Sequence, residues 1–276
     1  MGEEARTALQ DRVAIITGAA SGIGRAGARL FAASGALVVV ADIDERGGKQ
    51  TVDEIASEGG RAFLVTTDVS QDEQVRALVK SATGKHGRID ILWNNAAATN
   101  LVNQQDRPVH ELPENVWDQI LNVSLKGVYL CCKHVLPCMM AAKRGVVINT
   151  SSVDGMVGQG GYDSYAAAKG GIIAMTRSMA VYYSDYNVRV NAICPGFVRT
   201  EALDPWMASA RARSLIESLH LTRVGVPEDI AKFAVYLASD DAEYITGGVF
   251  PIDGGFTAFK TKVTNYSAPA GSGSQE

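Results

Sequence analysis

Cysteine, long apolar runs and clustered positive charge are all scarce in this sequence. Four cysteines in 276 residues do not make a disulfide framework. No apolar run approaches the roughly 18 residues that span a bilayer, and the polar N-terminal segment has no apolar stretch of the signal-peptide kind. The net charge is −4 without a long basic run, so nothing in it attracts nucleic acid or an anionic membrane. We therefore expect a cytoplasmic protein.

One cysteine-containing segment raises the question of a metal site. Cys131, His134 and Cys138 fall at i, i+3 and i+7 of a predicted helix. Three ligands that rise along one helix converge poorly on a tetrahedral ion. Small thiols flanked by leucine, valine and methionine are typical of a packed helix face, so we predict that no metal is bound.

The remaining composition is that of a globular chain with a sizeable core, because 46% of residues are hydrophobic and 20% charged. Short β-branched runs alternate with amphipathic helical segments, which predicts a doubly wound parallel sheet (Rossmann fold) in a single α/β domain. The expected strands are 13–17, 36–41, 62–66, 89–93, 146–149, 188–193 and 248–252. We expect a flexible N-terminus over 1–10, the domain over 11–260, and a flexible tail over 261–276.

Three segments between the strands carry further expectations. Residues 99–114 are polar and contain two prolines, which predicts a long loop. An apolar stripe predicts a helix from Glu114 to Met140 that Pro137 should end or kink. Residues 201–222 follow the sixth strand at the edge where open α/β sheets bind ligands, so this helix-like insertion is the candidate lid.

A glycine-rich turn follows the first strand directly. Gly18, Gly22 and Gly24 separate that strand from a helical segment that ends at Gly35. Glycines let the backbone approach a pyrophosphate, which rests on the amides of a helix N-terminus. The spacing differs from the G-x-G-x-x-G fingerprint, so the strand–turn–helix context carries the prediction of a dinucleotide site. A plain tight turn is the alternative.

Two aspartates follow the next strands. Asp42 ends the second strand, about twenty residues beyond the glycine turn, where a carboxylate can accept both hydroxyls of an adenosine ribose. The same charge repels a 2′-phosphate, so Asp42 favours NAD over NADP. Asp68, just after the third strand, either reaches the adenine or caps the following helix.

The segment around Tyr165 predicts the chemistry. Tyr165 and Lys169 lie four residues apart, so on a helix they stack one turn apart. A cation beside a phenol favours the phenolate and moves its pKa toward the range needed for general acid–base catalysis. Ser152 follows a buried strand and can hydrogen-bond a substrate oxygen at the same place. Taken alone, the Tyr-x-x-x-Lys pair is also compatible with a solvated helix face.

Taken together, the motifs resemble the classical short-chain dehydrogenase/reductase (SDR) family over residues 11–255. The resemblance depends on their order and spacing, which make the set specific although each motif is modest alone. The motifs are TGAASGIG (17–24), Asp42, Asp68-Val69, NNAA (94–97), Asn122, Ser152, YAAAK (165–169) and PGFVRT (195–200).

The resemblance implies a role for each matching residue. Tyr165 would be the general acid/base, Lys169 would lower its pKa and hold the nicotinamide ribose, and Ser152 would position the substrate oxygen. Asn122 would sustain a water-linked proton relay to Lys169. The implied cofactor-binding residues are Gly18, Ser21, Gly22, Ile23, Gly24, Asp42, Asp68, Val69, Asn95, Tyr165, Lys169, Pro195, Gly196, Val198 and Thr200.

The resemblance also has one departure and one further implication. The family usually has glycine where this chain has Ala97, which bears on the detail of the cofactor groove. Members are commonly tetrameric through the helices that carry Asn122 and Tyr165 and through the C-terminal strand. A homotetramer is therefore implied here, with a dimer as the alternative.

The function expected is NAD-dependent hydride transfer between nicotinamide and a secondary alcohol or ketone. The alternatives are a non-catalytic nucleotide-binding regulator on the same fold and an SDR-type epimerase or dehydratase. Leu203, Trp206 and Met207 on the lid suggest an apolar substrate wall, or they pack the lid on the body. Asp154, Gln159 and Tyr162 would equally suit a sugar.

Overall fold

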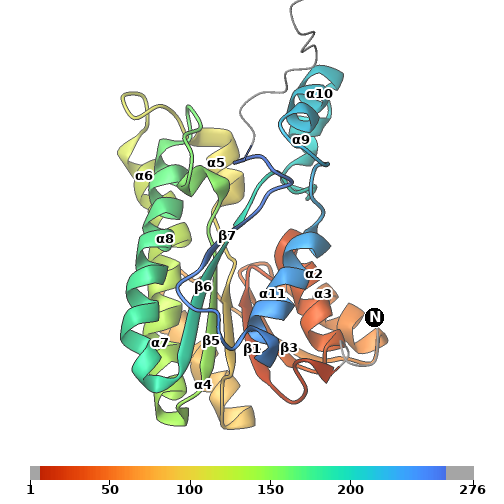
Figure 1. The fold of residues 1–276 in the computed structure, drawn as a ribbon, viewed down its shortest axis with the longest axis vertical. Coiled ribbons are helices and arrows are strands. Elements are labelled where there is room, and N and C mark those ends of the chain that lie inside the picture. The colour runs from red at the N-terminus through yellow and green to blue at the C-terminus, as the bar shows by residue number, and fades with distance from the viewer. Residues whose placement is uncertain (1–6, 259–276) are drawn as a thin grey trace, which may run out of the picture.

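The computed structural model describes residues 7–258, apart from the side chains of residues 205 and 206. Its centre is a seven-stranded sheet of order β3-β2-β1-β4-β5-β6-β7, in which every neighbouring pair is parallel (Figure 1). The strands are β1 (Val13–Thr17), β2 (Leu37–Asp42), β3 (Arg61–Thr66), β4 (Ile91–Asn94), β5 (Gly145–Thr150), β6 (Val188–Pro195) and β7 (Val249–Ile252). The predicted doubly wound sheet in a single domain is confirmed.

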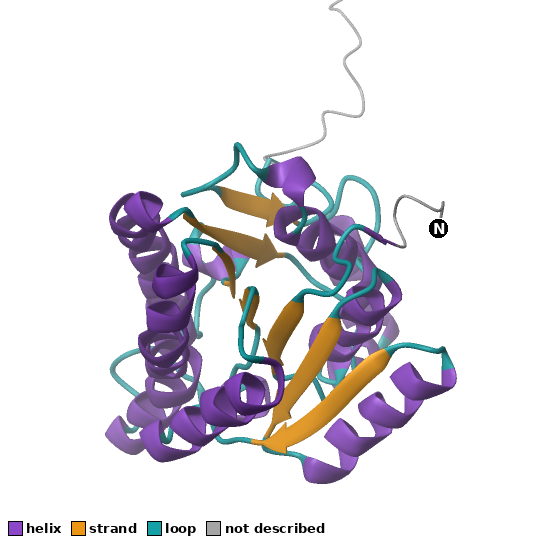
Figure 2. Ribbon diagram, turned by 90° about the horizontal axis from the view of Figure 1, so that it is seen from below, coloured by secondary structure: helices purple, strands orange, loops and turns teal. Residues whose placement is uncertain are grey.

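Helices cover both faces of the sheet, which is why its strands are apolar on both sides (Figure 2). One face carries α2 (Gly22–Ala33), α3 (Glu45–Ser57) and α11 (Pro227–Ala238); the other carries α4 (Asp72–His86), α7 (Gly127–Ala142) and α8 (Asp163–Tyr183). Alternate strand residues feed two cores, so Ile16 packs toward α2 whereas Ile15 packs toward α4 and α7. Trp93 stacks on Phe31 with ring centres 5.5 Å apart.

The segments between these helices differ from the expectations in two places. Residues 99–114 are not all loop, because α5 (Thr99–Gln105) forms within them before α6 (Glu114–Leu121). Pro137 does not end its helix, because α7 continues to Ala142. Pro137 and Lys133, whose carbonyl loses its helical donor, both lie on the exposed side, where water can hydrogen-bond that carbonyl.

The expected helix across 114–140 is also interrupted. Residues Asn122–Lys126 form a π-helical turn between α6 and α7, and the Gly127 amide donates to the Asn122 carbonyl. A π turn inserts one residue into the helical repeat and often marks a functional site. The turn therefore changes the direction in which Asn122 is presented.

The packed domain begins earlier than residue 11. Leu9 is fully buried in the core beneath α2, and its amide donates to the Ser34 carbonyl at 2.9 Å. The predicted tail, 261–276, lies outside the described residues. Within residues 7–258 no helix is both long and apolar enough to cross a bilayer.

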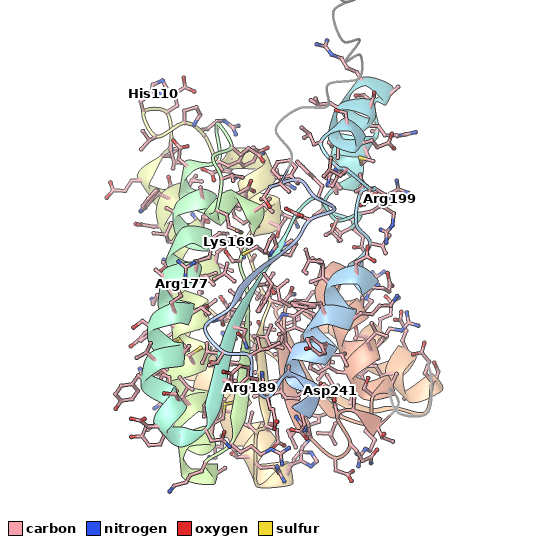
Figure 3. The ribbon with its side chains drawn as sticks, in the orientation of Figure 1. His110, Lys169, Arg177, Arg189, Arg199 and Asp241 are labelled. Atoms are coloured by element: carbon pink, nitrogen blue, oxygen red, sulfur yellow. The ribbon has the colours of Figure 1, made fainter. Side chains whose placement is uncertain are left out.

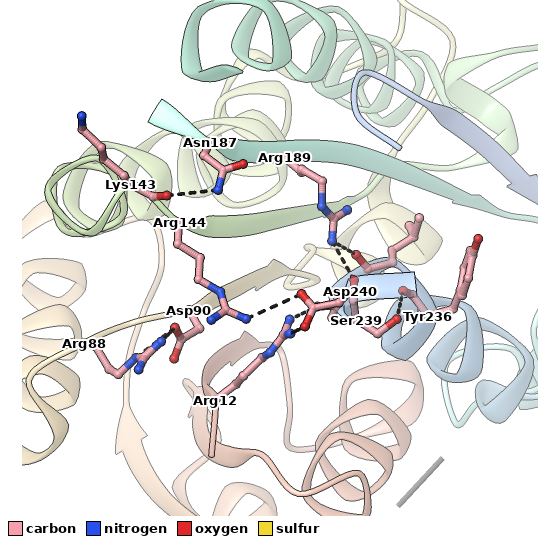
Figure 4. Close-up of polar contacts among 12 residues, drawn as sticks. Arg12, Arg88, Asp90, Lys143, Arg144, Asn187, Arg189, Tyr236, Ser239 and Asp240 are labelled. Atoms are coloured by element: carbon pink, nitrogen blue, oxygen red, sulfur yellow. Dashed lines mark hydrogen bonds and ion pairs between the residues drawn. The ribbon is translucent and has the colours of Figure 1, made fainter. Parts of the chain in front are cut away.

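Arginine side chains make ion pairs and hydrogen bonds at the amino ends of the strands (Figure 4). Arg12, before β1, contacts the Asp240 carboxylate at 2.5 Å and the Ala238 carbonyl at 2.6 Å. Arg189 donates to the Leu237 and Ser239 carbonyls, which are orphan acceptors at the end of α11. Side-chain contacts therefore occupy the amino ends of the strands, whereas a cavity lies at their carboxyl ends.

Candidate active site

A cavity of about 1550 Å³ lies at the carboxyl ends of the strands. It is lined by the β1–α2 turn, by residues that follow β2 to β6, and by residues of the segment between β6 and α11, which contains the short helices α9 (Asp204–Met207) and α10 (Ala210–Ser218); of these two helices, α10 contributes to the lining. The strand order reverses between β1 and β4, which is the position at which open α/β sheets bind ligands.

The glycine turn forms one wall of this cavity. Gly18 and Gly22 have backbone φ values of +66° and +49°, which residues other than glycine rarely adopt. A Cβ on Gly24 would lie 1.9 Å from the Gly18 carbonyl oxygen. Ser21 precedes α2 without capping it through its side chain. The backbone at the start of α2 is therefore a cradle that fits a pyrophosphate.

Asp42 and Val69 line the neighbouring part of the cavity. The Asp42 carboxylate accepts from the Ala20 amide at 2.8 Å and the Asp44 amide at 3.0 Å, so it fixes the glycine turn and keeps lone pairs for a ligand. Val69 is buried and packs against Gly127, where a Cβ would lie 2.8 Å from the valine methyl.

Asp68 also lines the cavity, and it does not cap α4. Its carboxylate accepts from the amide and hydroxyl of Ser70 at 2.9 Å and 2.7 Å, whereas Gln71 occupies the N-cap position. The capping alternative is therefore wrong, and the position near a bound adenine stays a prediction.

Asn95 fixes the glycine turn through hydrogen bonds to its backbone. Its side-chain amide donates to the carbonyls of Thr17 and Gly18 at 3.2 Å and 3.3 Å. The Thr17 hydroxyl accepts from the amides of Asn95 and Ala96 at 2.9 Å and 3.1 Å. The sequence indicated Thr17 only as part of the motif 17–24 and not its role, because a threonine that ends a strand has no local pattern that distinguishes this role.

Ser152, Tyr165 and Lys169 meet on the opposite wall. The Ser152 hydroxyl lies beside the Tyr165 phenol and acts to lower its pKa. The Lys169 ammonium donates to the Thr150 carbonyl at 2.8 Å and lies 5.4 Å from the centre of the Tyr165 ring. Figure 3 shows Lys169 on α8, next to the sheet. The sequence therefore identified three side chains that share one place in the fold.

Their electrostatics differ from the expectation. Burial raises the pKa of Tyr165, and the Asp154 carboxylate raises it further. Lys169 is only 2% exposed, and burial lowers its pKa to about 8. The expected lowering of the Tyr165 pKa by Lys169 does not appear in the protein alone, where desolvation is the largest influence on the pKa of each group.

Asp106 is a residue that sequence reasoning missed. It is buried, and its carboxylate accepts from the Tyr165 amide at 3.0 Å and the Ser164 amide at 3.4 Å. A carboxylate there satisfies free amides of the first turn of α8 and is favoured by the helix dipole. Asp106 therefore fixes the turn that presents Tyr165. Its partner is 59 residues away in sequence, so no local signal reveals it.

The predicted substrate residues divide into two groups. Asp154, Gln159 and Tyr162 line the cavity, together with Pro195, Gly196, Val198 and Thr200 from the segment that follows β6. Leu203 also lines it, but Met207 packs with Ile216 and Val224 in the segment between β6 and α11. The side chain of Trp206 lies outside the described part of the structure.

In the cysteine-containing helix, the histidine considered above as a metal ligand contacts a carboxylate. The His134 ring nitrogen lies 2.9 Å from the Asp72 carboxylate, and Cys131 is buried in the core. Within the described residues, no three histidine, cysteine or acidic side chains are arranged to hold a metal ion.

The family follows from this fold, this site and the comparisons with known proteins. A family model described as enoyl-(acyl carrier protein) reductase matches residues 18–257. The chain belongs to the short-chain dehydrogenase/reductase family of oxidoreductases.

Individual relatives match almost end to end. Cis-4-hydroxycyclohexanecarboxylate dehydrogenase of Sinomonas cyclohexanicum is 40% identical, over 91% of this chain and 98% of its own. Meso-2,3-butanediol dehydrogenase of Serratia marcescens is 38% identical, over 91% of this chain and 96% of its own. The crystal structure of gox2181 superposes with a TM-score of 0.87 at 29% identity, covering 92% of this chain and 98% of that one.

Proposed function

We propose that this protein is an NAD-dependent oxidoreductase that interconverts a secondary alcohol and its ketone. The observation that carries the proposal is the meeting of Ser152, Tyr165 and Lys169 on one wall of the cavity whose other wall is the glycine cradle. A proton-transferring group and a dinucleotide-sized cradle facing the same space are what hydride transfer to a carbonyl needs.

The cofactor assignment depends on charge and shape. The cradle of Gly18, Gly22 and Gly24 would hold the pyrophosphate, and Asp42 would accept the ribose hydroxyls and disfavour a 2′-phosphate. Nicotinamide supplies or accepts the hydride when bound. Val69 and Asn95 would line the groove, and Thr200, whose methyl lies 3.2 Å from a Cβ built on Gly22, would close over it.

The chain's own residues manage the oxygen and its proton. During reduction, Ser152 and Tyr165 would both hydrogen-bond the carbonyl oxygen, and Tyr165 would give its phenolic proton to that oxygen. During oxidation the same phenol, first deprotonated, would take the proton back. Lys169 would stabilise the phenolate, because a cation beside it offsets the desolvation that raises the pKa of Tyr165. Asn122, at the π turn, lines the same cavity and would support a proton relay to Lys169.

The names of the two relatives support an alcohol as substrate, since both are dehydrogenases of hydroxylated compounds. The cavity offers an apolar side at Leu203 and Leu219 and a polar side at Gln159 and Tyr162. We propose a secondary alcohol that carries both an apolar frame and a further polar group.

We also propose a homotetramer, with a dimer as the alternative. The outer faces of α7 and α8 expose large apolar side chains, including Tyr129, Val181 at 78% exposure and Tyr182 at 61%. Such patches are typical of subunit contacts. Sedimentation analysis of the full chain tests this. The cytoplasmic location expected from the sequence stays a prediction.

The test of function is a substrate panel. The protein is mixed with NAD or NADP and with cyclic, acyclic and sugar-like secondary alcohols, and the absorbance of reduced nicotinamide is followed. We expect turnover with NAD. Cofactor binding, seen as fluorescence quenching, without turnover of any alcohol or of the matching ketones would favour the nucleotide-binding regulator. Loss of water or inversion of a centre without net nicotinamide reduction would favour the dehydratase or epimerase.

A further inference from the structure

The Ser152 hydroxyl has a single hydrogen, and in the protein alone a carboxylate already takes it. A hydroxyl has one hydrogen and two acceptor sites. The Asp154 amide donates to the Ser152 oxygen at 3.1 Å and takes one acceptor site. The hydroxyl donates to the Asp154 carboxylate oxygen Oδ2 at 3.2 Å, and the Tyr165 phenol lies beside the same hydroxyl. A substrate carbonyl, which can only accept, would compete for the single hydrogen.

Asp154 therefore decides where that hydrogen goes. An ionised carboxylate has no hydrogen to give, so its contact with Ser152 requires the serine hydrogen. A protonated carboxyl can instead donate to Ser152, which frees the serine hydrogen for a substrate. The two protonation states leave the reacting oxygen with different numbers of donors.

The surroundings of Asp154 make this titration accessible. Burial raises its pKa, and its other oxygen, Oδ1, is buried without a hydrogen-bond partner in the described structure. The groups that face it come from α8 and the turn before it. The Lys169 ammonium favours the carboxylate, whereas the phenols of Tyr165 and Tyr162 are affected by its negative charge. Desolvation is the largest of these influences on Asp154.

We propose that Asp154 is a positioning residue whose protonation turns the Ser152 hydroxyl toward the substrate carbonyl. The protonated state gives the carbonyl oxygen two donors, Ser152 and Tyr165, and the ionised state leaves it with one. The inference rests on the proposed function, because it concerns the oxygen that this chemistry reduces.

The test is the pH dependence of kcat/KM for ketone reduction by NADH, from about pH 4.5 to 9. In the wild type we expect kcat/KM to fall about tenfold per pH unit above the Asp154 pKa, and to level off roughly 10- to 100-fold lower, as for loss of one donor. In Asp154→Asn the side-chain amide donates to Ser152 at every pH. This fall in kcat/KM, the Asp154 limb of the pH profile, therefore disappears.

Two further variants establish that the effect runs through Ser152. Glu201→Gln removes a different carboxylate that lines the same cavity, and we expect it to keep the limb. In a Ser152→Ala background, Asp154→Asn should not change the shape of the profile, because the shared hydroxyl is gone. NADH binding, measured by fluorescence, establishes that each variant is folded.

The outcomes separate the two proposals. A wild-type profile without the limb, a limb that survives in Asp154→Asn, or an equal effect of Asp154→Asn with and without Ser152 would overturn the role of Asp154 alone. Wild-type protein that binds nicotinamide but reduces no carbonyl and oxidises no alcohol would overturn the proposed function, and this inference with it.

Discussion

Replacing Lys169 by methionine should change how the stability of the protein depends on pH. Burial lowers the pKa of Lys169 from 10.5 to about 8 in the folded protein. Below pH 8 the ammonium is charged in both the folded and unfolded states, so folding carries the full cost of burying it. Between pH 8 and 10.5 the unfolded chain binds more protons, and the free energy of unfolding therefore rises with pH.

The size of this rise follows from the shift. The fall of the Lys169 pKa from 10.5 to about 8 corresponds to about 3 kcal/mol in the free energy of unfolding, at about 1.36 kcal/mol per pH unit. Methionine keeps the length of the side chain and removes the titration. It also leaves the Thr150 carbonyl without its 2.8 Å donor, at a cost of about 1–3 kcal/mol that is the same at both pH values.

The assay is urea unfolding followed by tryptophan fluorescence, for both proteins at pH 7 and pH 10.5 and at one protein concentration. We compare the free energy of unfolding of Lys169→Met with that of the wild type at each pH. We expect this difference to be about 3 kcal/mol more in favour of the variant at pH 7 than at pH 10.5. Ionisation of other groups cancels in this double difference. Equal differences at the two pH values would refute the argument, because they would mean that Lys169 is not buried as an ammonium.

Two predictions concern the cofactor groove. Asp42→Ala should lower the ratio of kcat/KM for NAD to that for NADP by about 10- to 100-fold, because it removes a charged acceptor worth about 1.5–3 kcal/mol; an unchanged ratio in steady-state assays would count against Asp42 as the ribose ligand. Gly24→Ala puts a methyl 1.9 Å from the Gly18 carbonyl oxygen, so the turn must move. We expect NAD to bind at least tenfold more weakly in calorimetry and the fold to lose about 1–3 kcal/mol. Gly84→Ala, where a methyl meets nothing within 4 Å, is the matched control and should keep wild-type affinity.

The fold could be predicted from sequence because its strands are buried on both faces. Runs such as residues 13–17 and 146–149 are continuous and β-branched, and no other element accounts for them as simply. The interior of the long helical segment was harder. Its apolar stripe continues through Asn122 with only a small phase change, so the periodicity does not reveal a π turn there. The prediction that Pro137 could end its helix was wrong, because a proline on an exposed helix face is tolerated.

The site was predictable only where its residues follow local rules. Tyr165 and Lys169 are related by one helical turn, and Asp42 by its place at the end of a strand. Asp106 is related to Tyr165 only through the folded chain, and the pKa shifts depend on burial that no spacing encodes. The carboxylate of Asp154 acquires its significance from a 3.2 Å contact with Ser152 that sequence order alone does not predict.

Substitution of Tyr165 by phenylalanine tests the central claim most directly, because it removes the transferable proton and keeps the ring. We expect kcat/KM for alcohol oxidation to fall by roughly 100- to 10,000-fold, the usual worth of a general acid–base group. The dissociation constant for NAD, measured by fluorescence quenching, should stay within about threefold, because the phenol contributes little to the affinity of the cradle. Turnover at the wild-type rate in this variant, with NAD still bound, would contradict the assignment of Tyr165 as the proton carrier.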